Sequence, residues 1–138
     1  MKRLIFLSFF LLCLTVSLFS QVSFQYENRS FTELGLTTNE QIAQYLQIEI
    51  SDLLPIFQHS SMRGQGASLS PAEFYDVIST VSNTRDFIAF GRICRELGIT
   101  MERFFLVFFR EMGGMPEADL QMTLAVIRIG IKWKVISQ

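Results

Sequence analysis

Helix-start signals constrain the fold of this chain more than any other feature of its sequence. Thr37 with Glu40, and Thr38 with Gln41, form two overlapping capping boxes, in which two side chains satisfy free N–H groups of a first helical turn. Residues 70–73 (Ser, Pro, Ala, Glu) repeat the pattern, with proline at the favoured first helical position. These signals predict helices that begin near residues 38 and 70.

Weaker signals divide the rest of the chain after residue 37 into further short helices. Residues 51–52 open a second helix that carries Pro55 near its first turn, and Asn83 or Thr84 caps a fourth helix that Gly98 ends. Two more helices are expected, over residues 101–112 and after residue 116. We therefore expect a mostly all-α fold: one compact bundle of five or six short helices over residues 37–138.

Two segments carry extended patterns. Apolar and polar residues alternate over residues 21–26, which predicts a short N-terminal strand within an extended segment over residues 21–36. Residues 126–136 also alternate, yet Leu120, Leu124, Ile127 and Ile131 fit a helical stripe. A strand there could pair only with the N-terminal strand, and a two-stranded sheet is only marginally stable. We favour the helix.

An internal repeat relates two parts of the expected bundle. Residues 42–57 align without gaps with residues 93–108, and four positions are identical: Ile42 and Ile93, Leu46 and Leu97, Ile48 and Ile99, Phe57 and Phe108. Each copy has the pattern of a helix, a tight turn centred on an apolar residue, and a second helix. We expect the turn isoleucine of each copy to fill the corner between its two helices.

The repeat resembles the helix-turn-helix of transcription regulators, in which sequences such as residues 93–100 are common. The resemblance implies two helix-turn-helix-like corners. DNA binding would also require a polar recognition helix, but the second helices here carry the apolar runs 53–57 and 104–109. Such residues cannot pair with base edges or phosphates. We expect the architecture without nucleic-acid binding.

The apolar run over residues 104–109 leaves no polar face on its helix. Either the helix over residues 101–112 is the central helix of the bundle, which we favour, or one of its faces docks a protein partner or a second copy of the chain. On the second interpretation the binding residues are Phe104, Phe105, Phe108 and Phe109.

The first twenty residues have the pattern of an export signal. Lys2 and Arg3 precede an apolar run over residues 4–19, and Ser20 is a small residue at which a signal peptidase could cut. We expect residues 1–20 to be a cleaved signal peptide and the product to be periplasmic or secreted. The alternative is an uncleaved anchor over residues 4–19, the one segment through which we expect membrane contact.

Charge and cysteine content restrict the remaining chain. Removal of Lys2 and Arg3 with the signal leaves 10 basic and 13 acidic residues, a net charge of −3. An acidic domain is poorly suited to binding a phosphate backbone. Cys94 is then the one remaining cysteine, and its helical neighbours indicate a small buried apolar side chain. The domain therefore depends on packing without an internal disulfide.

Few residues suit catalysis. His59 is the single histidine, and Glu73 and Asp76 lie three residues apart on one helix face, where they could bind a hard metal ion. Such residues are more often helix-end and surface side chains, so we expect no catalytic residue, metal or cofactor. The sequence favours an exported, non-catalytic interaction module. A small exported hydrolase or metal-dependent enzyme, and a membrane-tethered helper protein, are the alternatives.

Overall fold

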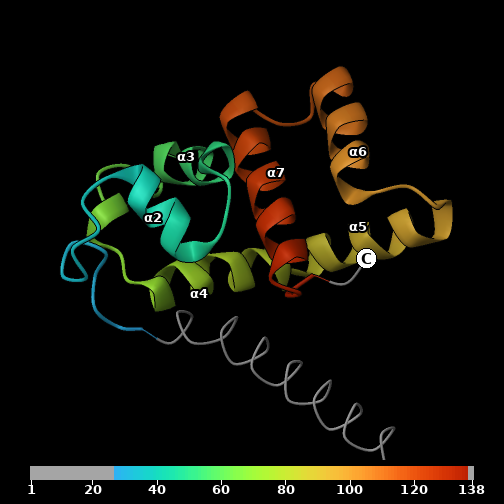
Figure 1. Ribbon diagram of the computed structural model, residues 1–138. Helices are drawn as coiled ribbons and strands as arrows, with labels where there is room; N and C mark the ends of the chain where they lie inside the picture. Colours follow the sequence, from blue (N-terminus) through green and yellow to red (C-terminus); the bar gives the residue numbers. More distant parts are fainter. Residues whose placement is uncertain (1–26, 137–138) are drawn as a thin grey trace, which may run out of the picture.

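The computed structural model describes residues 27–136, which form six α-helices and contain no strand (Figure 1). The helices are α2 (Asn39–Leu46), α3 (Ile50–Gln58), α4 (Pro71–Ser82), α5 (Arg85–Leu97), α6 (Met101–Phe105) and α7 (Glu117–Lys132). A 3₁₀ turn, η2 (Gly66–Ser68), precedes α4, and a π-helical segment, η3 (Leu106–Glu111), continues α6. The all-α prediction is confirmed. The expected signal peptide and the strand over residues 21–26 lie outside the described residues.

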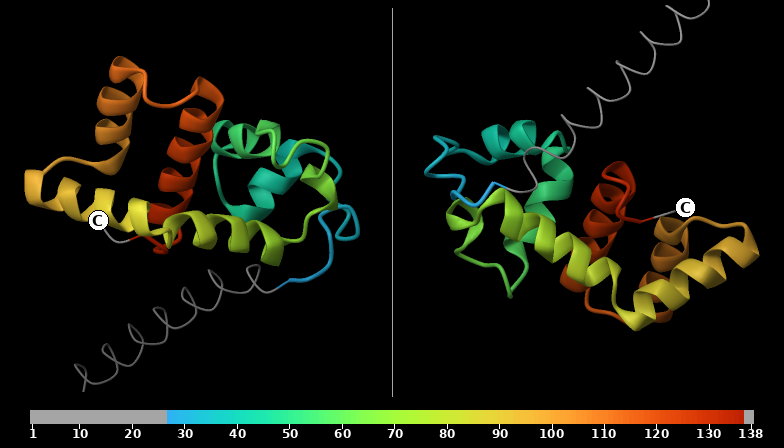
Figure 2. Two further views of the ribbon diagram at one scale, coloured as in Figure 1. Left: turned by 180° about the vertical axis from the view of Figure 1, so that it is seen from behind. Right: turned by 90° about the horizontal axis from the view of Figure 1, so that it is seen from below.

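The central element is α7, which lies between α3 and α6 with α4 beneath it (Figures 1 and 2). Its buried residues are Leu120, Leu124, Ala125, Val126, Ile127, Ile129 and Gly130. They point to more than one side of the helix because α7 contributes to two separate clusters of core residues. The helical interpretation of residues 126–132 is confirmed, and the strand alternative is wrong. The helix over residues 101–112, which we favoured as central, lies instead at the periphery.

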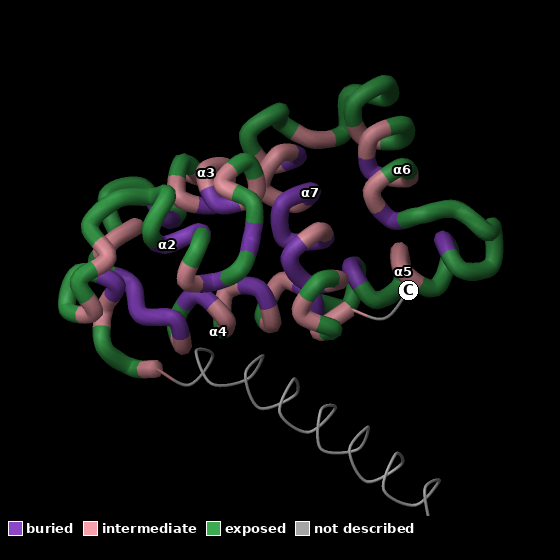
Figure 3. Tube along the Cα trace, in the orientation of Figure 1, coloured by how far each residue is buried: buried purple, intermediate pink, exposed green. Residues whose placement is uncertain are grey.

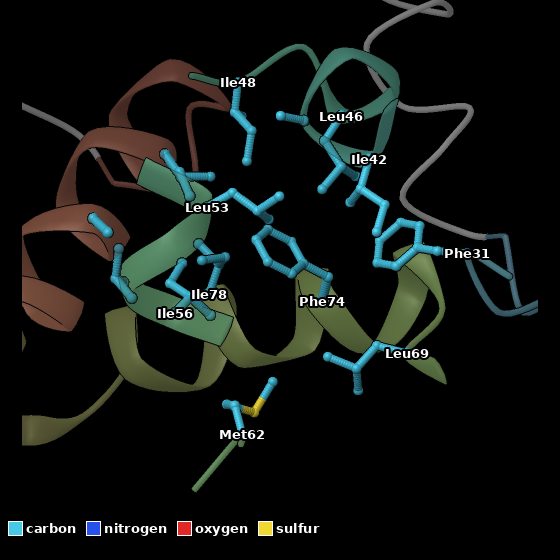
Figure 4. Close-up of a cluster of buried hydrophobic side chains, with 14 residues drawn as sticks. Phe31, Ile42, Leu46, Ile48, Leu53, Ile56, Met62, Leu69, Phe74 and Ile78 are labelled. Carbon is cyan, nitrogen blue, oxygen red and sulfur yellow. The ribbon is translucent and has the colours of Figure 1, made fainter. Parts of the chain in front are cut away.

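The larger core cluster joins α2, α3 and α4 to one side of α7 (Figure 4). Phe31 is fully buried in this cluster. The Phe31 N–H donates to the carbonyl of Leu69 (2.8 Å), and the Phe31 carbonyl accepts from the Leu36 N–H (2.8 Å). Residues 31–35 form a turn, and this turn lies against the cluster formed by the helices that follow it. The segment before α2 therefore supplies part of the core.

The smaller core cluster belongs to the second lobe of the molecule, which consists of α5, α6 and η3. Its buried residues are Phe87, Cys94, Met101 and Phe105 from this lobe, and Leu120, Leu124 and Ile127 from α7. Seven residues make up this cluster, against fourteen in the larger one. The smaller cluster covers less of its lobe, and much of the α5–α6 connection and of the segment after α6 is exposed (Figure 3).

An ion-pair bridge connects the lobes through α7. The guanidinium of Arg128 donates from Nε to Glu102 of α6 (2.9 Å) and from Nη1 to Asp52 of α3 (3.3 Å). Asp52 is largely buried, and this desolvation raises its pKa, while Arg128 opposes the shift. One side chain of α7 thus pairs with both α3 and α6.

Most of the predicted helix starts are confirmed. Thr38 and Gln41 form a capping box at α2, and Ser70 and Glu73 form another at α4. The proposed Thr37–Glu40 box is wrong, because the Thr37 N–H donates to the Gln41 side chain instead. None of the helices in the described part of the chain is long and apolar enough to cross a membrane.

Thr84 precedes α5 without a capping bond from its side chain. At the next helix, the Thr100 hydroxyl accepts from the Arg103 N–H, as its cap position predicts.

Candidate functional site

The two helix-turn-helix-like corners predicted from the repeat have the same backbone geometry. In the first corner Gln47 adopts a left-handed conformation (φ 59°), and the Ile48 N–H donates to the carbonyl of Ala43 (3.0 Å). In the second, Gly98 is left-handed (φ 69°) and the Ile99 N–H donates to the carbonyl of Cys94 (3.0 Å). These are the hydrogen bonds of a Schellman-type helix end. The repeated sequence therefore encodes a repeated local structure.

The two corners differ in burial. Ile42 and Leu46 are fully buried, whereas the equivalent Ile93 and Leu97 are 42% and 63% exposed. Ile48 fills its corner as expected, but Ile99 is 36% exposed. The expectation that the turn isoleucine fills both corners is therefore wrong for the second copy.

Tertiary cover explains this difference. The first corner lies in the larger core cluster, where Phe31 and Phe74 approach Ile42 and Leu46 (Figure 4). The second corner lies at the far end of the molecule (Figures 1 and 2). Ile93, Leu97 and Ile99 belong to neither core cluster of residues 27–136. The outer face of the second corner is therefore left uncovered by the described chain.

The four phenylalanines proposed as binding residues divide by burial. Phe105 is buried against α7 with Phe87, and Phe104 and Phe109 are half-buried. Phe108 is 48% exposed. Its ring stacks on that of Phe104 with the centroids 5.3 Å apart. The structure thus assigns Phe105 to the core and leaves Phe108, with parts of Phe104 and Phe109, exposed.

Side chains from both helices of the second corner form one continuous apolar surface. On α5, helical spacing places Phe90, Ile93 and Leu97 on one face. The Phe90 ring contacts that of Phe104 across the corner, with the centroids 5.5 Å apart. The surface continues through Phe108 to Met112, which is 73% exposed. We call this surface the apolar strip; it consists of Phe90, Ile93, Leu97, Phe104, Phe108 and Met112.

Sequence reasoning identified the η3 end of the apolar strip and missed the α5 end. The sequence feature that could have indicated the α5 end is the width of the apolar face of this helix. Phe87 and Cys94 are buried in the core, whereas Ile93 and Leu97 are exposed. A helix that buries one face needs apolar residues only on that face, so Ile93 and Leu97 lie outside what the α5 core face requires.

Cys94 is buried, as its pattern predicts, and borders a cavity of about 200 Å³ at the second corner. Burial raises the pKa of its thiol, which therefore stays protonated at neutral pH. Cys94 acts as a small apolar core side chain.

A serine–histidine–aspartate chain, which sequence reasoning did not find, lies where α3 ends beside the start of α7. His59 Nδ1 lies 2.8 Å from Ser61 Oγ, and Nε2 lies 2.7 Å from Asp119 Oδ1. The Ser61 N–H also points to Nδ1, so the proton is assigned to Nε2, which donates to Asp119. Asp119 was missed because it is sixty residues away in sequence.

This chain of hydrogen bonds has the order of a catalytic triad but not its surroundings. The backbone N–H groups of a nucleophile and its neighbour commonly stabilise an oxyanion. Here the Ser61 N–H donates to His59 Nδ1 and the Met62 N–H donates to the His59 carbonyl. Because both donors are engaged in the turn, we interpret the chain as a link between α3 and α7.

The acids considered for a metal-dependent enzyme do not gather around His59. Glu73 is engaged in the capping box of α4, and Asp76 borders an open apolar groove beside Met62 and Met122. Within residues 27–136 no three His, Cys, Asp or Glu side chains lie close enough together to hold a metal ion. The cluster required by the metal-dependent alternative is not formed.

Comparison with known proteins adds no relative, since no family model, no curated protein and no solved structure matches this chain. The apolar strip is therefore the feature from which a function can be argued.

Proposed function

We propose that this protein is an exported, non-catalytic interaction module of the cell envelope, periplasm or extracellular space, and that the apolar strip is its binding surface. The observation that carries the proposal is the contrast between the two corners. Equivalent residues, Leu46 and Leu97, are fully buried in one copy and 63% exposed in the other. A partner that covers the second corner would give it the cover that the first corner has within the chain.

The energetics of burial support this interpretation. Covering a large apolar side chain contributes roughly 1.5–3 kcal/mol, and a contiguous exposed apolar surface on a monomer commonly marks an interaction site. Leu97, Phe108 and Met112 each expose about half of their surface or more. The proposal therefore uses side chains that the fold alone leaves in water.

Site-specific photocrosslinking tests the binding surface. A photoreactive amino acid at position 93 is expected to capture a protein in cells that make this chain. The matched control is position 88, because Ile88 lies on the same helix with a similar exposure but on another face. Capture from neither position, or equal capture from both, would contradict the proposal.

The export part of the proposal rests on the pattern of residues 1–20. Mass spectrometry of the purified native protein is expected to give a mature chain that starts near residue 21. An intact N-terminus in a membrane fraction would favour the tethered alternative through residues 4–19, and an intact N-terminus in the cytosol would overturn export.

A further inference from the structure

We infer that the partner of the apolar strip is a second copy of this chain, joined to the first about a twofold axis. The inference rests on the proposed function and deepens it by naming the partner. Two properties of the second lobe carry it, the charges along the edges of the strip and the amount of apolar surface that the strip offers.

The edges of the apolar strip carry both signs of charge. Asp86, Arg92 and Glu96 lie beside it along α5, and Arg103 and Glu111 lie beside it along α6 and η3. Glu96 and Arg103 are exposed, and neither forms an ion pair with another residue between 27 and 136. Mixed borders do not match the uniformly negative surface of an anionic membrane or a nucleic acid.

A twofold copy matches these borders. In an isologous interface the same surface meets itself, and a twofold axis along the strip brings the α5 edge of each chain against the α6 edge of the other. This arrangement places Glu96 of each chain beside an Arg103 and repeats the contact on the other side of the axis. The apolar residues between the two edges then pack against their own equivalents.

The area of the strip indicates a weak dimer. An aromatic side chain has roughly 150–250 Å² of surface, so Phe108 at 48% exposure offers on the order of 100 Å². With Ile93, Leu97 and Met112, the strip offers on the order of 400 Å² of apolar surface, against about 800 Å² from each partner in a standard interface. The charged edges add to this area, and we expect dissociation in the micromolar range.

Sedimentation velocity over a range of concentrations tests the dimer, with Ile93→Asp compared with Ile88→Asp. The two isoleucines lie on one helix and are 42% and 46% exposed, but only Ile93 belongs to the strip. The wild type and Ile88→Asp are expected to dimerise alike. In Ile93→Asp the dissociation constant is expected to rise at least about 100-fold, since both copies lose the contact. Circular dichroism melting verifies that both variants fold.

Charge reversal tests the twofold arrangement. Glu96→Arg is expected to weaken the dimer several-fold, and the double variant Glu96→Arg with Arg103→Glu is expected to restore it. The inference is overturned if the wild type stays monomeric up to about millimolar concentration, if both aspartate variants dissociate alike, or if the double variant dimerises no better than Glu96→Arg. A monomer that still gives position-93 crosslinks to another protein would refute the dimer and leave the proposed function standing.

Discussion

At the scale of single residues, the two corners show how one backbone conformation is reached by different amino acids. Glycine adopts a left-handed conformation without steric cost, whereas a residue with a Cβ atom is strained there. Gly98 takes this conformation in the second corner, and the exposed Gln47 takes it in the first. The first corner is therefore strained at a position where the second is not.

Gln47→Gly is expected to raise the free energy of unfolding by about 0.5–1 kcal/mol, because it removes this strain. The matched variant Gly98→Gln is expected to lower it by a similar amount. A Cβ atom at Gly98 would meet nothing within 4 Å, so strain is the main effect. Urea denaturation measures both values. A loss of stability in Gln47→Gly would show that the glutamine side chain contributes something more than strain.

At the scale of secondary-structure elements, helix starts with and without a side-chain cap can be compared directly. Thr38 and Thr84 are both exposed threonines at N-cap positions. The Thr38 hydroxyl accepts from the Gln41 N–H, whereas the Thr84 hydroxyl donates to the carbonyl of Val81. Only the first hydroxyl satisfies a free N–H group of its helix.

Thr38→Ala is expected to lower the free energy of unfolding by about 1 kcal/mol, the usual value of an N-cap bond. Thr84→Ala is expected to cost less, since its surface hydrogen bond to Val81 can be replaced by water. Thermal unfolding followed by circular dichroism compares the two variants. Equal losses would mean that the capping box at α2 adds nothing to its stability.

The sequence predicts these elements well because their signals are local. The Ser70–Glu73 box, the glycine at position 98 and the Thr100 cap each act within one turn of chain, and each is found in the structure. What sequence reasoning misses depends on contacts between distant segments. Examples are the burial of Phe31, the partnership of His59 with Asp119, and the central position of α7.

The π-helical segment is a second difference between expectation and structure. Residues 101–112 were expected to form one regular helix, but the chain changes to a wider helical turn from Leu106 to Glu111. π-helical segments are rare in proteins, and those that occur often lie at functional sites. Phe108, the exposed member of the phenylalanine run, lies within this segment.

At the scale of the whole molecule, Arg128 of α7 pairs with Asp52 of α3 and with Glu102 of α6, and Asp52 makes this contact sensitive to pH. Burial raises the pKa of Asp52, whose unperturbed value is 3.8. The folded state therefore binds the proton more tightly than the unfolded state. The resulting stabilisation is fully present below the unfolded pKa and is lost as the pH rises through the folded pKa.

The difference in unfolding free energy between the wild type and Asp52→Asn is expected to change with pH. Measured by urea denaturation from about pH 3.5 upward, this difference (wild type minus variant) should fall as the pH rises through the raised pKa, and then level off. Comparison with the variant cancels the contributions of other carboxylates, such as Glu27 and Glu117, whose pKa values are lowered. A difference that does not vary with pH would contradict the account of Asp52.

The unequal cover of the two corners is the central claim about the whole molecule. One lobe completes its core within the described chain, whereas the other leaves the apolar strip exposed. The unequal cover connects the repeat in the sequence with the difference in burial, and the proposed function rests on it.

Hydrogen–deuterium exchange at low and high protein concentration tests this claim most directly, because it reports both corners in one experiment. We expect the backbone amides of α5, α6 and η3 to exchange more slowly as the concentration rises through the dimerisation range. Those of α2 and α3 are expected to exchange at unchanged rates, and Ile93→Asp is expected to abolish the effect. Exchange in α5 and η3 that is independent of concentration, or protection that rises equally in α2 and α3, would contradict the account.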